Sequence, residues 1–159
     1  MSEFTHIDKQ GRVRMVDVTE KEPTLRVAVA QGIVSMNPDT FDKIMNQTVQ
    51  KGNVLETARI AGIMAAKKTA ELIPMCHPLK ITHIAIDFFP DKTKSTIKIE
   101  GTVRIVDQTG VEMEALTAVS IAGLTIYDMC KSYDRKMIIS DICLIKKSGG
   151  KSGVFMRKK

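Results

Sequence analysis

The sequence predicts an α+β fold in which an antiparallel sheet carries helices on one of its faces. Stretches rich in Val and Ile with the two-residue periodicity of strands alternate with longer stretches that have apolar residues at helical spacing. From residue 25 the order is strand, helix, strand, strand, helix, strand. This order is the split βαβ pattern of ferredoxin-like folds, whose helices pack against one face of the sheet.

The first third of the chain supplies two strand candidates and a short helix. Residues 13–18 (VRMVDV) are a short strand candidate, and residues 25–36 (LRVAVAQGIVSM) are a longer one. Residues 38–47 begin with Pro and Asp, which suits the first turn of a helix, and Asn37 is placed to cap it.

A long helix and a hairpin follow. Residues 54–73 form the helix, which Pro74 ends, and its Gly and Ala residues allow another helix to approach closely. Residues 82–89 (THIAIDFF) and 95–106 (STIKIEGTVRIV) alternate like neighbouring strands, with a turn at residues 90–92 between them.

Residues 111–132 are the second long helix, and residues 137–145 are the last strand. The middle of this helix is apolar on nearly every side, through Leu116, Ala118, Val119, Ile121, Ala122, Gly123, Leu124, Ile126 and Cys130. Because one sheet covers only one face of a helix, the second apolar face predicts self-association. A membrane-surface helix is the alternative, but this helix has no basic face.

The composition is that of a globular protein of one domain. Of 159 residues, 43% are hydrophobic and 26% charged, and we expect residues 1–159 to form a single domain with flexible ends at 1–12 and 148–159. Three scattered cysteines, and no apolar run near the ~20 residues that span a bilayer, favour a reduced, cytoplasmic chain without a membrane partner.

The net charge of +6 combines 24 basic with 18 acidic residues, which favours anionic ligands without requiring nucleic acid. Aromatic residues make up only 4%, so little is available for stacking on bases. The basic excess is sharpest near the C-terminus. It is either a solubilising tail or an arm that closes over phosphate.

The first candidate site is a turn bracketed by Pro74 and Pro78. Prolines fix the local backbone, which helps to aim the side chain of His77 as an acid, a base or a hydrogen-bond donor. A purely structural, hydrogen-bonded His77 is the alternative. Cys76 and His77, with His83 nearby, are conceivable metal ligands, although adjacent residues do not match a standard zinc spacing.

Two carboxylates, Glu112 and Glu114, open the second long helix. They could simply complement the helix dipole. Flanked by Val111 and Met113, they could instead be partly desolvated and accept hydrogen bonds from the N–H groups of a guanine-like edge.

Near the end of the same helix, Asp128 and Lys131 are three residues apart and share a face. An exposed ion pair there contributes little to stability, whereas a desolvated Lys131 would serve as an acid or base. Glu114 lies about four turns earlier on nearly the same face, so two acids and one lysine are predicted along a single stripe.

Two basic, glycine-containing segments are candidates for phosphate binding. Lys51 precedes a helix N-terminus, where it could join backbone amides around a phosphate. Residues 147–153 (KSGGKSG) contain GKS but are not a P-loop, because Ile145 occupies the first glycine position and no helix follows.

Six segments of the chain closely resemble the cyclic pyranopterin monophosphate synthase family, also called the molybdenum cofactor biosynthesis protein C family. They are residues 5–6, 15–18, 58–67, 76–79, 110–117 and 124–131. The resemblance runs from about residue 4 to residue 153, and blocks of eight or more residues in the right order make it specific. Small departures stand at Met75, Asn53 and Ser132, where Leu, Asp and Ala are usual.

The resemblance implies a ferredoxin-like subunit in a homohexamer, a trimer of dimers with active sites at the dimer interfaces. It implies a small-molecule, guanine-derived triphosphate substrate, 3′,8-cyclo-7,8-dihydroguanosine 5′-triphosphate, converted to cyclic pyranopterin monophosphate with release of pyrophosphate. We expect no cofactor, and any Mg²⁺ would arrive with the triphosphate, because the sequence offers no cage of ligands for it.

Residue by residue, the resemblance assigns catalytic roles to Asp128, Lys131 and Lys51. The residues that match substrate-lining segments are Met75, Cys76, His77, Glu112, Met113 and Glu114. Weaker candidates for phosphate contacts are Arg26, Lys67, Lys147 and Lys151.

Two other classes of function are weighed against this one. A ferredoxin-like RNA-binding domain should carry aromatic residues on one face of its central strands, but the consecutive Phe88 and Phe89 point to opposite faces. A metal-handling module built on Cys76, His77 and His83 would require bound zinc.

Overall fold

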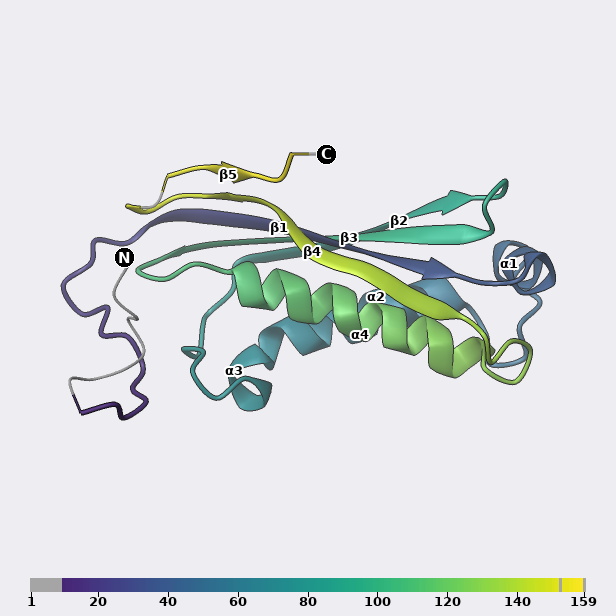
Figure 1. Cartoon of the computed structure of the whole chain (residues 1–159), viewed down its shortest axis with the longest axis horizontal. Helices are drawn as coiled ribbons and strands as arrows, with labels where there is room; N and C mark the ends of the chain where they lie inside the picture. The colour runs from purple at the N-terminus through teal and green to yellow at the C-terminus, as the bar shows by residue number, and fades with distance from the viewer. Residues whose placement is uncertain (1–9, 152, 159) are drawn as a thin grey trace.

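The computed structural model describes residues 10–151 and 153–158, and its strands form one antiparallel sheet in the order β2-β3-β1-β4-β5 (Figure 1). The strands are β1 (Thr24–Ser35), β2 (His83–Asp91), β3 (Thr96–Asp107), β4 (Ile138–Ser148) and β5 (Phe155–Met156). β3 pairs with both β1 and β2, and β4 pairs with the other side of β1. The predicted ferredoxin-like arrangement is therefore confirmed, with β5 added at one edge.

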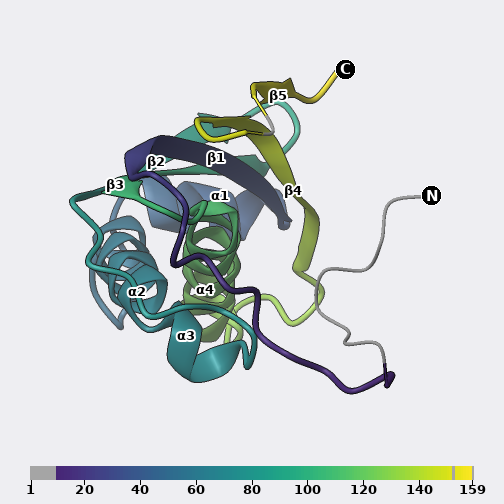
Figure 2. The same ribbon diagram turned by 90° about the vertical axis from the view of Figure 1, so that its left-hand side faces the viewer.

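Two long helices lie side by side against one face of this sheet (Figures 1 and 2). The helices are α1 (Pro38–Met45), α2 (Val54–Lys67), α3 (Thr69–Leu72) and α4 (Glu112–Cys130). The predicted cap of α1 is confirmed, because the side chain of Asn37 accepts a hydrogen bond from the Thr40 amide at 2.7 Å. Asn53 caps α2 in the same way, at 3.1 Å from the Glu56 amide.

The sheet and α4 approach closely where β1 and β3 lack side chains. A Cβ atom on Gly32 of β1 would lie 2.8 Å from one methyl carbon of Val119, and one on Gly101 of β3 would lie 2.9 Å from the other methyl carbon of the same residue. Ile97 and Ile99, on the same face of β3, are fully buried beneath the helices. The two glycines thus let α4 settle deeply against the middle of the sheet.

The second apolar face of α4 is covered within the chain, by α2. Gly62 of α2 allows this approach, since a Cβ there would lie 2.8 Å from the Ala118 carbonyl oxygen and 3.4 Å from the Ala122 Cβ. The apolar surround of α4 therefore does not by itself require a second copy of the chain. Leu124 of α4 remains 54% exposed.

Helix α4 is also long and apolar enough to cross a membrane by length and composition, with a mean hydropathy of 1.2. Half of it is buried between the sheet and α2, which is the environment of a core helix. The hydropathy of α4 is thus explained by packing.

Several predicted boundaries differ from the structure. Residues 13–18 form only an isolated bridge at Val13, because Asp17 accepts hydrogen bonds from the amide and hydroxyl of Thr19 and turns the chain. The predicted helix over 54–73 is divided at Lys68 into α2 and α3. The hairpin turn lies beyond Asp91 rather than at residues 90–92, since β2 continues through Pro90 at the sheet edge.

The ends of the chain were predicted to be flexible over residues 1–12 and 148–159. Residues 1–9, 152 and 159 lie outside the described residues. Within the C-terminal segment, Phe155 and Met156 pair with Lys147 and Lys146 as strand β5. Flexibility of the ends stays a prediction.

Candidate active site

A pocket of about 580 Å³ lies at the N-terminal end of α4 and is called here the Glu114 pocket. Its lining comes from the chain before β1, the turn after α3 and the start of α4: Val16, Val18, Lys21, Ile73, Met75, Cys76, His77, Leu79, Thr109, Gly110, Glu112, Met113 and Glu114. All six residues predicted to line a substrate site are therefore brought together.

Glu114 is the buried acid of this pocket, with only 3% of its surface exposed. Burial raises the pKa of Glu114 to about 7, and the charge of Glu112 contributes to the increase. The carboxyl group can therefore exchange a proton near neutral pH. It could donate a hydrogen bond to a ligand when protonated and accept one when ionised.

The neighbouring turn is fixed by a hydrogen bond from the Cys76 amide to the Ile73 carbonyl at 3.1 Å, as well as by its two prolines. Burial raises the pKa of the Cys76 thiol, and the nearby charge of Glu114 raises it further. Cys76 is thus held as a neutral thiol. Nε2 of His77 lies 3.0 Å from the carbonyl oxygen of Val16, so this ring is tied to the chain before β1.

A second pocket of about 760 Å³, lined by four basic and three acidic side chains among others, adjoins the first and is called here the Lys147 pocket. The two share Lys21, Thr109, Gly110 and Glu112 in their linings. The second also includes three of the four predicted phosphate contacts, Arg26, Lys147 and Lys151. The fourth, Lys67, lies exposed in the last turn of α2 and lines neither pocket.

The boundary between the pockets is an ion pair between Lys147 and Glu112, whose Nζ and Oε1 atoms are 2.8 Å apart. Arg26 donates to the carbonyl oxygens of Asp107 and Gln108, at 3.2 and 3.1 Å, which anchors its guanidinium at the pocket wall. Gly149 must be glycine here, because its φ is +100° and a Cβ would lie 2.2 Å from the Leu25 carbonyl oxygen.

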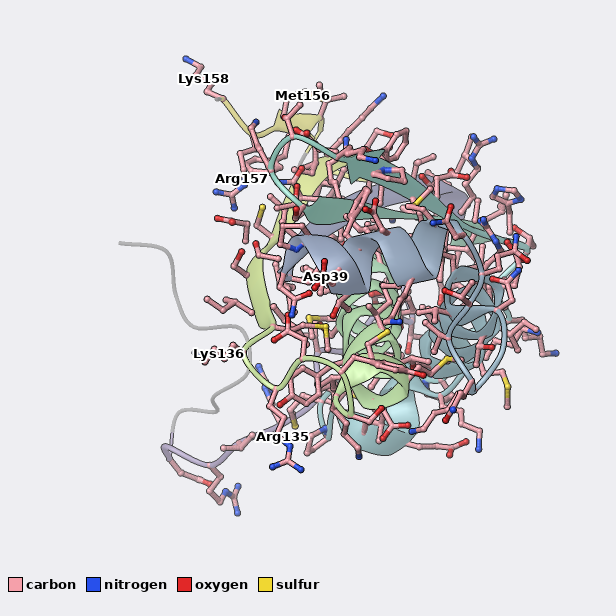
Figure 3. The ribbon with its side chains drawn as sticks, turned by 90° about the vertical axis from the view of Figure 1, so that its right-hand side faces the viewer. Asp39, Arg135, Lys136, Met156, Arg157 and Lys158 are labelled. Atoms are coloured by element: carbon pink, nitrogen blue, oxygen red, sulfur yellow. The ribbon has the colours of Figure 1, made fainter. Side chains whose placement is uncertain are left out.

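The third group, the lysine–aspartate cluster, consists of Lys51, Asp128 and Lys131 at the other end of α4. The Asp128 carboxylate lies 2.6 Å from Lys131 Nζ and 3.1 Å from Lys51 Nζ, and Lys51 also donates to the Asp128 carbonyl at 2.8 Å. All three side chains are about half exposed. Figure 3 views this end of the molecule, with Arg135 and Lys136 in the turn that follows α4.

Hydrogen bonding sets the charge states in this cluster. Hydrogen bonds from Lys131 and Lys51 lower the pKa of Asp128, and the hydrogen bond to Asp128 raises the pKa of Lys131. The carboxylate is therefore ionised and the Lys131 ammonium is protonated at neutral pH. Such an ammonium is a proton donor or an electrostatic partner for an anion.

The predicted single stripe of two acids and one lysine is not a single site in the structure. Glu114 is buried in its pocket, whereas Asp128 is exposed and lies fourteen residues further along α4, about 20 Å at the helical rise. One chain thus holds two separated parts, the adjoining pockets and the lysine–aspartate cluster.

Two residues that contribute to the candidate site were not predicted from the sequence. Lys21 lines both pockets, but it sits in a segment of charged residues whose spacing gives no signal. Tyr133 accepts a hydrogen bond from the Gln50 amide at 3.2 Å and so helps to hold the chain beside Lys51. This contact joins residues 83 apart in the sequence, which no local pattern predicts.

Among residues 10–151 and 153–158, no group of three or more His, Cys, Asp or Glu side chains could hold a metal ion. Phe88 packs against the core, while Phe89, pointing to the other face of β2, is 46% exposed. The described part of the chain thus offers neither a cluster for zinc nor a paired aromatic platform on β2.

Comparison with known proteins shows the family of the chain. A model of the MoaC family matches residues 15–150. The cyclic pyranopterin monophosphate synthase of Desulforapulum autotrophicum is 64% identical over 156 residues, which are 98% of this chain and 96% of that protein. Proteins of the same name from Desulfatibacillum aliphaticivorans and Roseiflexus sp. are 62% and 60% identical, over 99% and 98% of this chain and 99% of each relative. The chain belongs to the MoaC family.

Proposed function

We propose that the chain is a cyclic pyranopterin monophosphate synthase, a cytoplasmic lyase of molybdenum cofactor biosynthesis. It would convert 3′,8-cyclo-7,8-dihydroguanosine 5′-triphosphate to cyclic pyranopterin monophosphate and pyrophosphate. The observation that carries the proposal is the identity of 60–64%, nearly from end to end, to three proteins of that name.

The two adjoining pockets suit the two halves of such a substrate. The Glu114 pocket combines apolar walls with a titratable acid, as a flat, polar-edged ring system requires. The Lys147 pocket presents Arg26, Lys147 and Lys151 to an anion. In this proposal the guanine-derived part occupies the first and the triphosphate the second, with any Mg²⁺ carried by the triphosphate.

The chemistry requires protons to be moved on a ring that opens and closes again, and charge to be stabilised on phosphate. Glu114, with its pKa of about 7, is suited to exchange a proton with the ring-derived part at neutral pH. Lys131, protonated beside Asp128, is suited to donate one. Lys51 is the second proposed catalytic lysine, and Asp128 holds both ammonium groups in place.

The distance along α4 supports an active site shared between two copies of the chain. The lysine–aspartate cluster lies about 20 Å from Glu114 along the helix, too far to act on a ligand within that pocket. We therefore assign the pockets of one copy and the cluster of its neighbour to each active site. A homohexamer built as a trimer of dimers would provide such sites.

The first test is to incubate the purified protein with the cyclic triphosphate and to follow pyrophosphate release together with pterin fluorescence after oxidation. Asp128→Ala should abolish both signals while substrate binding and the oligomer persist. The matched control is Asp39→Ala, since Asp39 is exposed on α1 outside all three groups (Figure 3). Absence of both products with the folded, oligomeric wild-type protein would contradict the proposed function.

A further inference from the structure

Residues 16–22, called here the strap, run over both pockets without forming a helix or a strand. Val16 and Val18 line the Glu114 pocket, Glu20 and Glu22 line the Lys147 pocket, and Lys21 lines both. Figure 2 shows the chain before β1 crossing the ends of α4 and α3. The strap is thus one continuous wall of the whole candidate site.

The strap is shaped locally and tied to the body by side chains. Asp17 and Thr19 form a small turn through hydrogen bonds of 2.9 and 2.7 Å, and the Lys21 amide donates to Val18 at 3.0 Å. Toward the body, His77 Nε2 lies 3.0 Å from the Val16 carbonyl oxygen. Gln108 Nε2 reaches the Thr19 carbonyl oxygen at 3.5 Å, a much weaker contact.

The partner of His77 determines which of its ring nitrogens carries hydrogen. A carbonyl oxygen can only accept, so Nε2 must be the donor, either in the neutral Nε2–H tautomer or in the imidazolium ion. Proton exchange between His77 and a ligand would then pass through Nδ1. The Pro74–Pro78 turn fixes the backbone that aims this ring, so the hydrogen bond places Val16 relative to a rigid point.

We propose that His77 is a positioning residue that holds the strap over the site through Val16, and that it thereby sets the position of Lys21 between the two pockets. The kinetic consequence rests on the proposed function. Breaking the hydrogen bond would loosen the strap at the Glu114 pocket, which weakens substrate binding more than it slows the chemical steps.

The test compares His77→Phe, which keeps a flat ring without a donor, with His77→Gln, whose side-chain amide can donate from about the same position. His83→Gln is the control, because His83 is exposed on β2 and lines neither pocket. Hydrogen–deuterium exchange of residues 16–22 is measured by mass spectrometry on the full chain without substrate.

The rate of hydrogen–deuterium exchange in the strap should rise roughly five- to tenfold in His77→Phe, which is the effect of about one lost hydrogen bond. In His77→Gln and His83→Gln it should stay near the wild-type value. KM should rise by a similar factor in His77→Phe with a smaller change in kcat, and it should rise less in His77→Gln. Unchanged exchange in His77→Phe, or an equal rise in His77→Gln, would overturn the proposal. Because exchange is measured without substrate, a wild-type chain without synthase activity would contradict the proposed function and leave the strap contact testable.

Discussion

At the scale of single residues, the Glu114 carboxyl couples the site to the stability of the fold. Its pKa in the folded chain is about 7, above the ordinary value of 4.5, because burial disfavours the ionised form. Below pH 4.5 both the folded and the unfolded chain hold this proton. As the pH rises from 4.5 through 7, the unfolded chain loses it first, so the free energy of unfolding falls.

We expect Glu114→Gln to remove this fall, which amounts to at most about 3 kcal/mol. Urea denaturation at pH 5 and pH 7.5 measures the change for the wild type and the variant. Glu71→Gln, an exposed acid on α3, should keep the wild-type pH dependence. An equal fall in the wild type and in Glu114→Gln would mean that Glu114 ionises in the folded chain at its ordinary pKa.

Burial favours the neutral form of Glu114, whereas the hydrogen bond to Asp128 favours the charged form of Lys131 and raises the pKa of its ammonium. Asp128→Asn removes the negative charge, so the pKa of Lys131 should fall toward the ordinary value of about 10.4. Titration of the lysine side-chain carbon signals by NMR measures the shift. The signal of Lys136, in the turn after α4, serves as the reference in the same sample (Figure 3). An unmoved Lys131 signal would remove Asp128 as the group that tunes it.

Sequence reasoning reached this cluster only in part. Asp128 and Lys131 were predicted to be neighbours from their helical spacing, and their 2.6 Å contact confirms it. Lys51 was predicted from its position before a helix only as a phosphate ligand, and its catalytic role came from the resemblance alone. It lies 77 residues from Asp128 and meets it only when the loop before α2 packs beside the end of α4. Burial of Glu114 was one of two alternatives that the sequence left open, since carboxylates in a first helical turn often remain solvated and only complement the helix dipole.

At the scale of elements, the contact between α2 and α4 depends on Gly62. A Cβ there would lie 2.3 Å from the Ile86 side chain and 2.8 Å from the Ala118 carbonyl oxygen. Gly62→Ala gains helix propensity of about 1 kcal/mol, but its methyl group forces α2 away from α4 and from β2. We expect a net loss of about 1–2 kcal/mol in the free energy of unfolding, measured by urea denaturation.

Gly123→Ala on α4 is the matched control, because its new methyl group would meet side chains and no backbone atom: Ile139 at 3.2 Å and Ile99 at 3.7 Å. A side chain can yield where a backbone carbonyl cannot, so this variant should lose less stability than Gly62→Ala. Greater stability of Gly62→Ala than of the wild type would show that the two helices can separate without cost.

The elements themselves were largely predictable, because local chemistry determines them. Asn37 caps α1 as its position indicates, and the alternation in β1 and β3 matches their buried faces. The division at Lys68 was missed because it depends on Thr69, whose hydroxyl bonds to the Ala66 carbonyl at 3.0 Å and ends α2. The extended strand candidate at 13–18 was wrong beyond the bridge at Val13, because Val16 and Val18 line a pocket instead of pairing with the sheet.

At the scale of the whole molecule, the arrangement separates the two pockets from the lysine–aspartate cluster. The pockets lie at one end of α4 and the lysine–aspartate cluster at the other, and the sheet joins both rigidly through the packing of α4 on β1, β3 and β4. Bending the chain to bring the two together would break the core. A second copy that lays its own cluster against the pockets requires no such change.

Mixed oligomers test this arrangement directly. Glu114→Gln and Asp128→Ala should each be inactive alone, but a mixed dimer related by a two-fold axis would contain one site with both substitutions and one with neither. Random mixing in equal amounts makes half of the dimers mixed, so about a quarter of the wild-type activity should return.

Mixing Asp128→Ala with Lys131→Ala is the control. Both changes lie in the same cluster, so every site keeps one defect and no activity should return. Native mass spectrometry would establish that mixed oligomers form. If they form from Glu114→Gln and Asp128→Ala without recovering activity, each active site is built from one chain, and the separation along α4 must be bridged in another way.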